Sequence, residues 1–422
     1  MPAESTARTT GSDGLPDGFM WGTGASSLQT EGAAPRSDWY AWEAAGRAPR
    51  SGDGNGFGVR YQEDFAQLAE LGLTHHRLSL DWARLEPHPG RHDPAAVEHY
   101  RAVLTAARDA GISVWVCLHH FDLPGWFSED QGGFLEPGGR SRTWPRHVDW
   151  VGETFGDLVH GWMPVNEPVA YAMLGWLLGT IPPGRRDPER FAEALEAVLL
   201  AEHEAWRVLR SGDQPTCTIH SLMPVFAATA GEDERRTAAA RANAELVDEV
   251  VWRTWIRAMR DGLLHVPGRG LIEVPEMAGA FDLIGFSYYH ALGVTADNTF
   301  VPHPAGIRPG PLGLPPWAEG LRICLERLAD DLPGRPLVVS ECGLGTWTAD
   351  DDDEQRCQYL TDCLEITRDA VADGIDVRGF FHWTGVDNYE WGLGFDAAFG
   401  LIDRDRSPKP SAELARRWAT GR

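Results

Sequence analysis

Short apolar runs alternate with longer amphipathic segments along this chain, and most runs stop at a polar residue, a glycine or a proline. Runs of this length, rich in valine, leucine and aromatic residues, are typical of buried strands. They predict strands over residues 19–24, 74–82, 112–118, 161–165, 216–225, 281–289, 336–341 and 377–383.

The segments between the runs carry helical spacing and helix end signals. Phe65, Leu68 and Leu71 follow one another at helical intervals, and Gly72 ends that segment. Asp93 before Pro94 is a cap followed by a first-turn proline. The predicted helices cover residues 61–71, 94–111, 144–158, 188–209, 236–263, 317–329, 353–373 and 411–420. The glycine-rich stretch 51–58 and the proline- and glycine-rich stretch 302–316 are expected to be loops, the second without internal structure.

Repeated strand and helix units in one sheet give parallel pairing with right-handed crossovers. Eight such units with strongly apolar strands favour a closed barrel over an open sheet. A doubly wound sheet would carry a glycine-rich phosphate turn after its first strand, and Gly22 and Gly24 are not followed by one. We therefore predict an α/β fold, a single (β/α)8 TIM barrel over residues 18–422. Residues 1–17 are polar and lack the apolar centre of a signal peptide, which predicts a disordered leader.

Composition narrows the classes of partner. A net charge of −24 disfavours nucleic acid and anionic membrane surfaces as partners, and its ordinary effect is solubility. The sequence contains no run of 18 apolar residues, so it predicts no transmembrane helix. The six cysteines are scattered, which indicates reduced thiols and a cytoplasmic protein. Cys342 has no paired histidine to make it a nucleophile, so we expect it to serve packing.

Polar side chains gather where the predicted strands end, which is where such barrels carry their active sites. Glu167 follows the run that stops at Val165, and Glu341 ends the run that begins at Pro336. The full set is Gln29, Arg77, His120, Asn166, Glu167, Tyr289, Glu341, Trp383, Glu390 and Trp391. It offers two central carboxylates but no His or Asp cluster spaced to hold a metal, so we expect neither metal nor cofactor.

Two carboxylates without a metal suit glycoside hydrolysis, in which one group protonates the leaving oxygen and the other attacks or activates water. Arg77 would hold one of them ionised, and the 18 tryptophans can supply flat apolar surfaces for sugars. Taken one at a time, each of these residues also fits a structural role. Only the combination points to this chemistry.

The same residues carry a family resemblance that extends over nearly the whole chain. The chain resembles glycoside hydrolase family 1, the β-glucosidase family of retaining TIM-barrel enzymes. The similar motifs are QTEG at 29–32, HRLSLDW at 76–82, HHFDLP at 119–124, NEP at 166–168, SECG at 340–343, and Trp383 with DNYEW at 387–391.

The resemblance implies roles for the candidate residues. Glu167 would be the general acid/base and Glu341 the nucleophile, with Arg77 and Tyr289 hydrogen-bonded to the nucleophile. Sugar-binding roles would fall to Gln29, His120, Asn166, Tyr289, Trp383, Glu390 and Trp391. The implied substrate is a small β-glycoside, and a retaining mechanism requires the two carboxyl groups to be about 5–5.5 Å apart.

Three positions depart from the family pattern, and all leave the catalytic groups in place. Ser287 replaces an asparagine on the leaving-group side, Cys342 replaces the asparagine after the nucleophile, and Ala398 replaces a basic residue. Glu390 argues against the branch that uses 6-phosphorylated sugars, because a carboxylate repels phosphate. The leaving group, the preferred sugar and the oligomeric state stay open. So do two alternatives, a transglycosylase that uses the same residues and a non-catalytic sugar-binding barrel.

Overall fold

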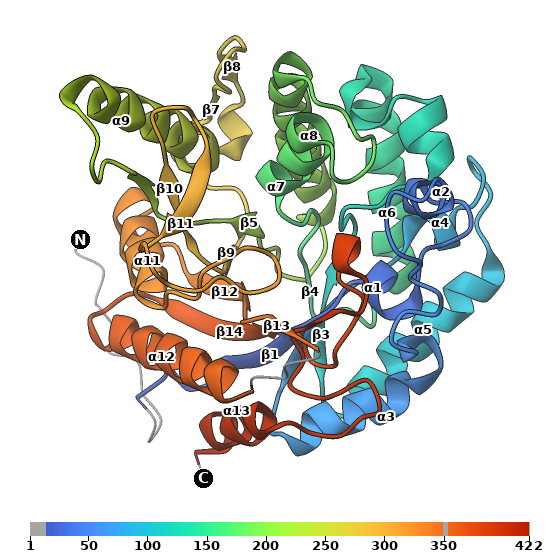
Figure 1. The fold of residues 1–422 in the computed structure, drawn as a ribbon. Coiled ribbons are helices and arrows are strands. Elements are labelled where there is room, and N and C mark those ends of the chain that lie inside the picture. Colours follow the sequence, from blue (N-terminus) through green and yellow to red (C-terminus); the bar gives the residue numbers. More distant parts are fainter. Residues whose placement is uncertain (1–13, 349–352, 422) are drawn as a thin grey trace, which may run out of the picture.

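Eight parallel strands form the centre of the molecule in a computed structural model that describes residues 14–348 and 353–421 (Figure 1). They run in the order β4-β3-β2-β1-β14-β12-β9-β5. Their bounds are β1 Met20–Gly24, β2 His75–Ser79, β3 Ser113–Cys117, β4 Gly161–Trp162, β5 His220–Ser221, β9 Ile284–Tyr288, β12 Leu337–Cys342 and β14 Val377–Trp383.

Backbone hydrogen bonds close this sheet into a ring between its two edge strands. The amide of Cys217 donates to the carbonyl of Trp162 (2.8 Å), and the amide of Glu167 donates to the carbonyl of Ile219 (2.8 Å). The predicted single barrel is therefore confirmed, with a strand of the ring at each of the eight apolar runs.

Helices follow the strands and surround the ring (Figure 1). The long ones are α3 Phe57–Glu70, α5 Pro94–Asp109, α6 Trp144–Phe155, α8 Pro188–Leu209, α9 Glu234–Asp248, α10 Thr254–Asp261, α11 Glu319–Asp331, α12 Asp353–Ala372 and α13 Pro410–Thr420. Short ones lie in the connections: α1 Ser27–Glu31, α2 Asp38–Ala44, α4 Trp82–Leu85, α7 Pro168–Ala172, and the π-helical turns η1 Trp126–Asp130, η3 Gly139–Thr143, η4 Met173–Leu178 and η5 Glu249–Arg253. The 3-10 turns are η2 Gly133–Leu135, η6 Pro275–Met277 and η7 Trp391–Leu393.

Two sets of buried side chains hold the layers together. The larger set packs the helices against the outer face of the strands. The smaller set fills the inside of the ring with Met20, Trp115, Met163, Cys217, Ile219, Val338 and Phe381. Because this interior is filled with side chains, the barrel has a solid base on which polar residues can be fixed near the strand ends.

Small sheets outside the ring account for two corrections to the predicted elements. The run 216–225, expected as one strand, divides into β5 and β6 (Val225–Ala227), because Pro224 between them has no amide hydrogen to donate. β6 pairs with β10 (Ala291–Val294), which pairs with β11 (Phe300–His303). Residues 302 and 303 therefore belong to a strand, although the stretch 302–316 was expected to lack structure. Two further pairs are β7 Leu263–Leu264 with β8 Ile272–Glu273, and β13 Thr346–Trp347 with β15 Ala397–Ala398.

Two predicted elements have different bounds. The predicted strand 74–82 ends earlier, because Asp81 caps α4 by accepting a hydrogen bond from the amide of Arg84 (3.0 Å). The predicted helix 236–263 consists of α9, η5 and α10, and it ends at Gly262 in the left-handed conformation (φ 70°).

The N-terminal prediction falls mostly outside the described residues, since residues 1–13 of the expected leader lie there. Within the described part, Leu15 is buried against the core. All six cysteines are free thiols, and Cys342 is buried, as the packing role requires. Across residues 14–348 and 353–421, no helix combines the length and apolar character needed to cross a bilayer.

Candidate active site

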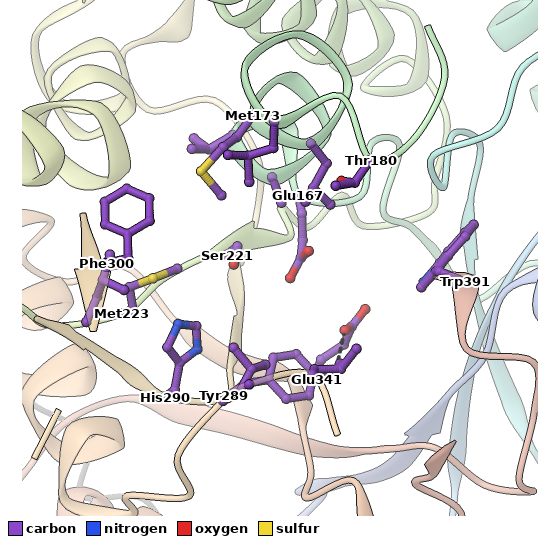
Figure 2. A pocket seen from close by; sticks show the side chains of 18 of the residues that line it. Glu167, Met173, Thr180, Ser221, Met223, Tyr289, His290, Phe300, Glu341 and Trp391 are labelled. Carbon is purple, nitrogen blue, oxygen red and sulfur yellow. Dashed lines mark hydrogen bonds between the residues drawn. The ribbon is translucent and has the colours of Figure 1, made fainter. Parts of the chain in front are cut away.

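A cavity of ≈ 570 Å³ opens at the carboxyl ends of the barrel strands. Figure 2 shows Glu167 and Glu341 on opposite sides of this cavity, with their carboxyl groups directed toward one another. Eight of the predicted site residues line it: His120, Asn166, Glu167, Tyr289, Glu341, Trp383, Glu390 and Trp391. The other two, Gln29 and Arg77, lie directly behind lining residues and bond to them.

An irregularity in β12 determines where Glu341 points. Val338 faces the inside of the ring and Val339 the outer core, so simple alternation would put Ser340 inside and Glu341 outside. The register shifts between Val339 and Glu341 against the neighbouring strand β9, which is a β-bulge. The extra residue turns Glu341 into the cavity and leaves Cys342 in the outer core.

Each carboxylate oxygen of Glu341 accepts a hydrogen bond from a neighbouring side chain. The buried guanidinium of Arg77 forms an ion pair with one carboxylate oxygen, and the hydroxyl of Tyr289 donates to the other (2.7 Å). Arg77 also donates to Oδ1 of Asn166 (2.8 Å) and to Nδ1 of His120 (2.9 Å). One buried cation therefore fixes three of the side chains that the sequence selects.

His120 is neutral in this arrangement. Burial, together with the adjacent charge of Arg77, lowers its pKa well below the ordinary histidine value. A guanidinium can only donate, so Nδ1 of His120 accepts from Arg77. The other ring nitrogen, Nε2, lies 3.3 Å from Nδ2 of Asn166. The two contacts hold the imidazole ring in one orientation at the cavity.

Glu167 has a different environment, which consists of apolar burial and hydroxyl groups. Burial raises its pKa to about 7, and the negative charge of Glu341 adds to the rise. The hydroxyl of Ser287 donates to Glu167 Oε1, and the hydroxyl of Ser221 is a second hydrogen-bond partner. Glu167 therefore keeps its proton under conditions in which an ordinary glutamate would lose it.

The backbone at Glu167 is also unusual. Glu167 is in the left-handed region (φ 44°, ψ 65°) immediately before Pro168 starts α7. Phe121 and Trp391 also have positive φ values, of 72° and 42°, and both line the same cavity. Non-glycine residues in this region are strained, and such strain concentrates at functional sites.

Gln29 and Glu390 form the polar end of the cavity. Nε2 of Gln29 donates to Glu390 Oε2 (3.1 Å) and to the carbonyl of Tyr389 (2.8 Å), while Ser26 donates to Gln29 Oε1 (2.8 Å). Burial raises the pKa of Glu390 to about 8, with a further contribution from the charge of Glu341. This end therefore presents an amide and a carboxyl group in fixed orientations.

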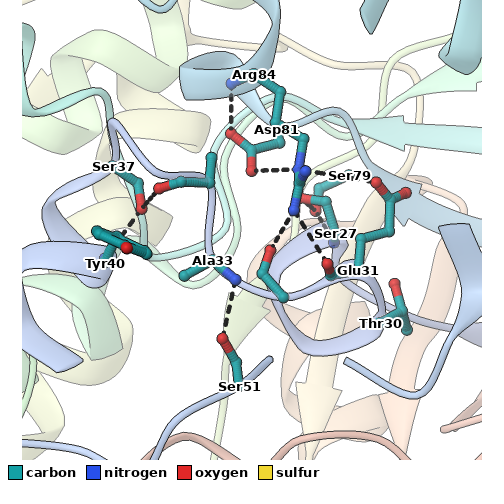
Figure 3. A network of polar contacts seen from close by, with 12 residues as sticks. Ser27, Thr30, Glu31, Ala33, Ser37, Tyr40, Ser51, Ser79, Asp81 and Arg84 are labelled. Carbon is teal, nitrogen blue, oxygen red and sulfur yellow. Dashed lines mark hydrogen bonds and ion pairs between the residues drawn. The ribbon is translucent and has the colours of Figure 1, made fainter. Parts of the chain in front are cut away.

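A polar network behind Gln29 holds α1 against the ends of the strands (Figure 3). Arg84 donates to the carbonyls of Glu31 (3.0 Å) and Gly32 (2.6 Å) and pairs with Asp81 (3.2 Å). The amide of Ser27 donates to the hydroxyl of Ser79 (2.8 Å). Because one end of α1 is tied to the last residue of β2 and the other to the connection after β2, the position of Gln29 is fixed relative to Arg77.

Aromatic rings complete the polar end. Trp383 lies 5.7 Å from the ring of His120 at an interplanar angle of 24°, and the Arg77 guanidinium lies 5.6 Å from the Trp383 ring. Trp391 lies 5.9 Å from His120 at 19°. These rings offer flat apolar surfaces beside hydrogen-bonding groups, which is what the faces of a sugar require.

Sequence reasoning missed two features of the cavity. Ser221 ends β5, and the rule that selected the other strand-end residues would have found it. Ser287 lies before the end of β9, so that rule does not select its contact with Glu167. The apolar side of the cavity opposite Trp391 comes from η4, η5, β10, β11, Met223 and the segment 312–315, and no sequence signal brings these together. No cluster of His, Cys, Asp or Glu in the described chain could hold a metal ion.

Comparison with known proteins finds one enzyme family along nearly the whole chain. The family model for glycosyl hydrolase family 1 matches residues 11–419. The thermostable beta-glucosidase B of Thermobispora bispora is 31% identical over 430 residues, which cover 94% of this chain and 89% of that protein. The coniferin beta-glucosidase of Pinus contorta is 28% identical over 472 residues, covering 96% and 91%.

A solved structure shows the same fold. The beta-glycosidase from Pyrococcus horikoshii superposes with a TM-score of 0.85 at 29% identity, over 96% of this chain and 94% of that one. The cavity at the strand ends, the full-length similarity and the family match together show that the chain belongs to glycosyl hydrolase family 1 and is an O-glycosyl hydrolase.

Proposed function

We propose that the protein is a retaining, exo-acting β-glycosidase, a β-glucosidase by preference, with Glu341 as nucleophile and Glu167 as general acid/base. The observation that carries the proposal is that these two buried carboxyl groups face each other across one cavity in opposite electrostatic surroundings. Such a pair supplies both groups of a double displacement.

In the first step, a carboxylate oxygen of Glu341 attacks the anomeric carbon while Glu167 gives its proton to the glycosidic oxygen. The bond to the leaving group breaks, and a glycosyl ester of Glu341 remains. In the second step, Glu167 accepts a proton from water, and the water oxygen attacks the anomeric carbon and releases Glu341. This mechanism requires a carboxyl separation of about 5–5.5 Å.

The polar end of the cavity is the proposed site for the sugar. Gln29, His120 and Glu390 would bind its hydroxyls, Asn166 its 2-hydroxyl, and Tyr289 would orient Glu341. Trp383 would stack on the ring, and Trp391 would contact it near its 3- and 4-hydroxyls. Gln29 is fully buried and Glu390 nearly so, so the described residues enclose this end of the cavity. This supports removal of single sugars from the non-reducing end.

The test compares Glu341→Gly and Glu167→Ala with the parent protein on aryl β-glucosides. Loss of the nucleophile should lower kcat/KM by at least about 10³-fold for every leaving group. Loss of the acid should cost about 10²–10⁴-fold for poor leaving groups. It should cost far less for dinitrophenol, which departs without a proton. Glu413→Ala, on the exposed side of α13, is the matched control and should keep full activity.

The same assay separates the remaining alternatives. Retention should appear as a β-configured first product in the NMR spectrum. Transfer to added alcohol in preference to water would show a transglycosylase instead. Calorimetric binding of glucose with no turnover of any β-glycoside would show a sugar-binding barrel. Full activity of both glutamate variants would refute the assignment of roles.

A further inference from the structure

The cavity extends well beyond the polar end where the sugar is expected. Figure 2 shows Trp391 on one side of the two glutamates and Met223 and Phe300 on the other. The residues on that far side are almost all apolar, among them Met173, Met223, Val251, Leu292, Phe300 and Leu312. We define these six as the apolar wall. It lies where a leaving group attached to the anomeric oxygen would project.

Few polar groups face this part of the cavity. Of the described residues that line it, Thr180, Ser221 and His290 are the polar ones away from the sugar end. Ser221 is already bonded to Glu167, and burial lowers the pKa of His290 to about 4, so its ring is uncharged at neutral pH. A second sugar would leave most of its hydroxyls without partners in such a place, and unpaired polar groups bind poorly.

Large apolar side chains remain exposed at the rim of the same region. Leu178, Phe300 and Leu312 line the cavity and are 37%, 43% and 40% exposed. They lie on η4, β11 and the segment 312–315, which are far apart in the sequence. Apolar side chains that converge at one opening mark a site for an apolar ligand. The two methionines of the wall are flexible enough to follow a ligand of irregular shape.

We propose that the leaving-group site takes an apolar aliphatic alcohol, so that the natural substrates are glucosides of long-chain alkyl or terpenoid alcohols and not oligosaccharides. This inference rests on the proposed function and names its leaving group. The cavity of ≈ 570 Å³ falls in the range of pockets that enclose ligands of drug size, larger than a single sugar. Burial of the alkyl part against the wall supplies the affinity, and Glu167 supplies the proton that an alkoxide leaving group needs.

The test measures kcat/KM for methyl, butyl, hexyl and octyl β-glucosides and for cellobiose. Each methylene that enters the wall should raise kcat/KM by about 2–4-fold. We expect octyl glucoside to exceed both methyl glucoside and cellobiose by about 100-fold or more. Phe300→Ser and Leu312→Ser remove apolar surface at exposed positions, where folding tolerates the change. Each should lower the octyl-to-methyl ratio by about 5-fold or more.

Leu271→Ser is the matched control, because Leu271 is 59% exposed and lies outside the cavity. It should leave the chain-length series unchanged. A flat series, or cellobiose equal to octyl glucoside, would refute the apolar site even though aryl glucosides are hydrolysed. No hydrolysis of any glucoside would instead refute the proposed function, so the two failures are distinguishable.

Discussion

The two glutamates that face each other across the cavity have different surroundings. Glu341 is enclosed by permanent donors, since Arg77 pairs with one oxygen and Tyr289 bonds the other. Glu167 faces hydroxyls and apolar atoms, and its pKa is raised to about 7 by burial and by the charge of Glu341. We infer that the cation beside Glu341 and the burial of Glu167 together separate the proposed roles of the two glutamates.

The comparison also shows how the two sides depend on each other. Arg77 stabilises the charge of Glu341, and that charge in turn contributes to the raised pKa of Glu167. The difference in environment between the two carboxyl groups is therefore a property of the pair and not of either residue alone. Substitutions around either glutamate should therefore change activity and stability, and the expected effects range from large to small.

Arg77→Met should have the largest effect. It keeps most of the side-chain volume but leaves a buried carboxylate without its cation, and it removes the donor to Asn166 and His120. Breaking a buried pair in this way costs about 3–5 kcal/mol of unfolding free energy. We expect kcat/KM at pH 6 to fall on the order of 10³-fold, because the proposed nucleophile Glu341 loses its cation and the side chains of Asn166 and His120 lose their donor. Urea unfolding and steady-state kinetics check the two effects.

Arg406→Met is the matched control for this prediction. Arg406 forms an equally buried pair with Asp64, away from the cavity. Its loss should lower stability by a similar amount, about 3–5 kcal/mol, and leave kcat/KM of the folded protein near the parent value. Equal loss of activity in both variants would mean that Arg77 serves the fold and not the charge on Glu341.

At pH 8, replacing each glutamate by glutamine should change the unfolding free energy in opposite directions. The folded-state pKa of Glu167, about 7, lies above its ordinary value of 4.5. The folded state therefore gains stability from this proton below pH 4.5 and loses it as the pH rises through 7. Glu167→Gln should match the parent protein at pH 5 and exceed it at pH 8 by on the order of 2–3 kcal/mol.

Glu341→Gln should lower stability at both pH values, because it leaves the Arg77 guanidinium buried and unpaired. Urea unfolding of the three proteins at pH 5 and pH 8 checks this contrast. If Glu167→Gln and the parent protein keep a constant difference between the two pH values, Glu167 does not titrate in the window that its surroundings indicate.

The barrel could be predicted from the sequence because its strands are buried on both sides and therefore read as continuous apolar runs. β9 and β14 are examples, since each lies within the predicted residues. The prediction was wrong where a tertiary pairing decided the outcome. β6 and β11 pair with β10 outside the ring, and neither 216–225 nor 302–316 carries a signal for that small sheet.

The candidate residues could be predicted because polar groups at strand ends are easy to recognise. The sequence did not show which way their side chains point. Glu341 faces the cavity because of the bulge at Ser340, and alternation alone would have turned it outward. Gln29 is placed by Arg84 and Asp81, which hold α1 through contacts from another connection. The six residues of the apolar wall lie on six separate segments of the chain, so the sequence contains no local trace of it.

Ser287→Ala should have the smallest effect, and it addresses the Glu167 side alone. The Ser287 hydroxyl donates to Oε1 of Glu167 and lowers the pKa of that carboxyl group, in opposition to burial. Without this donor the pKa of Glu167 rises further, so this proposed general acid stays protonated to higher pH. The basic limb of kcat/KM should therefore move upward by about 0.5–1 pH unit, because Ser221 still supplies one hydrogen bond.

Ser340→Ala is a close control for this last change, because the buried Ser340 hydroxyl has no hydrogen-bond partner among the described residues and adjoins Glu341. It makes the same chemical change on the other side of the cavity and should leave the basic limb in place. If both variants shift the basic limb of the kcat/KM profile, the limb responds to the loss of any hydroxyl near the cavity and not to Glu167 in particular. A shift in Ser287→Ala alone would show that the basic limb is the titration of Glu167, the group whose surroundings differ most from those of Glu341.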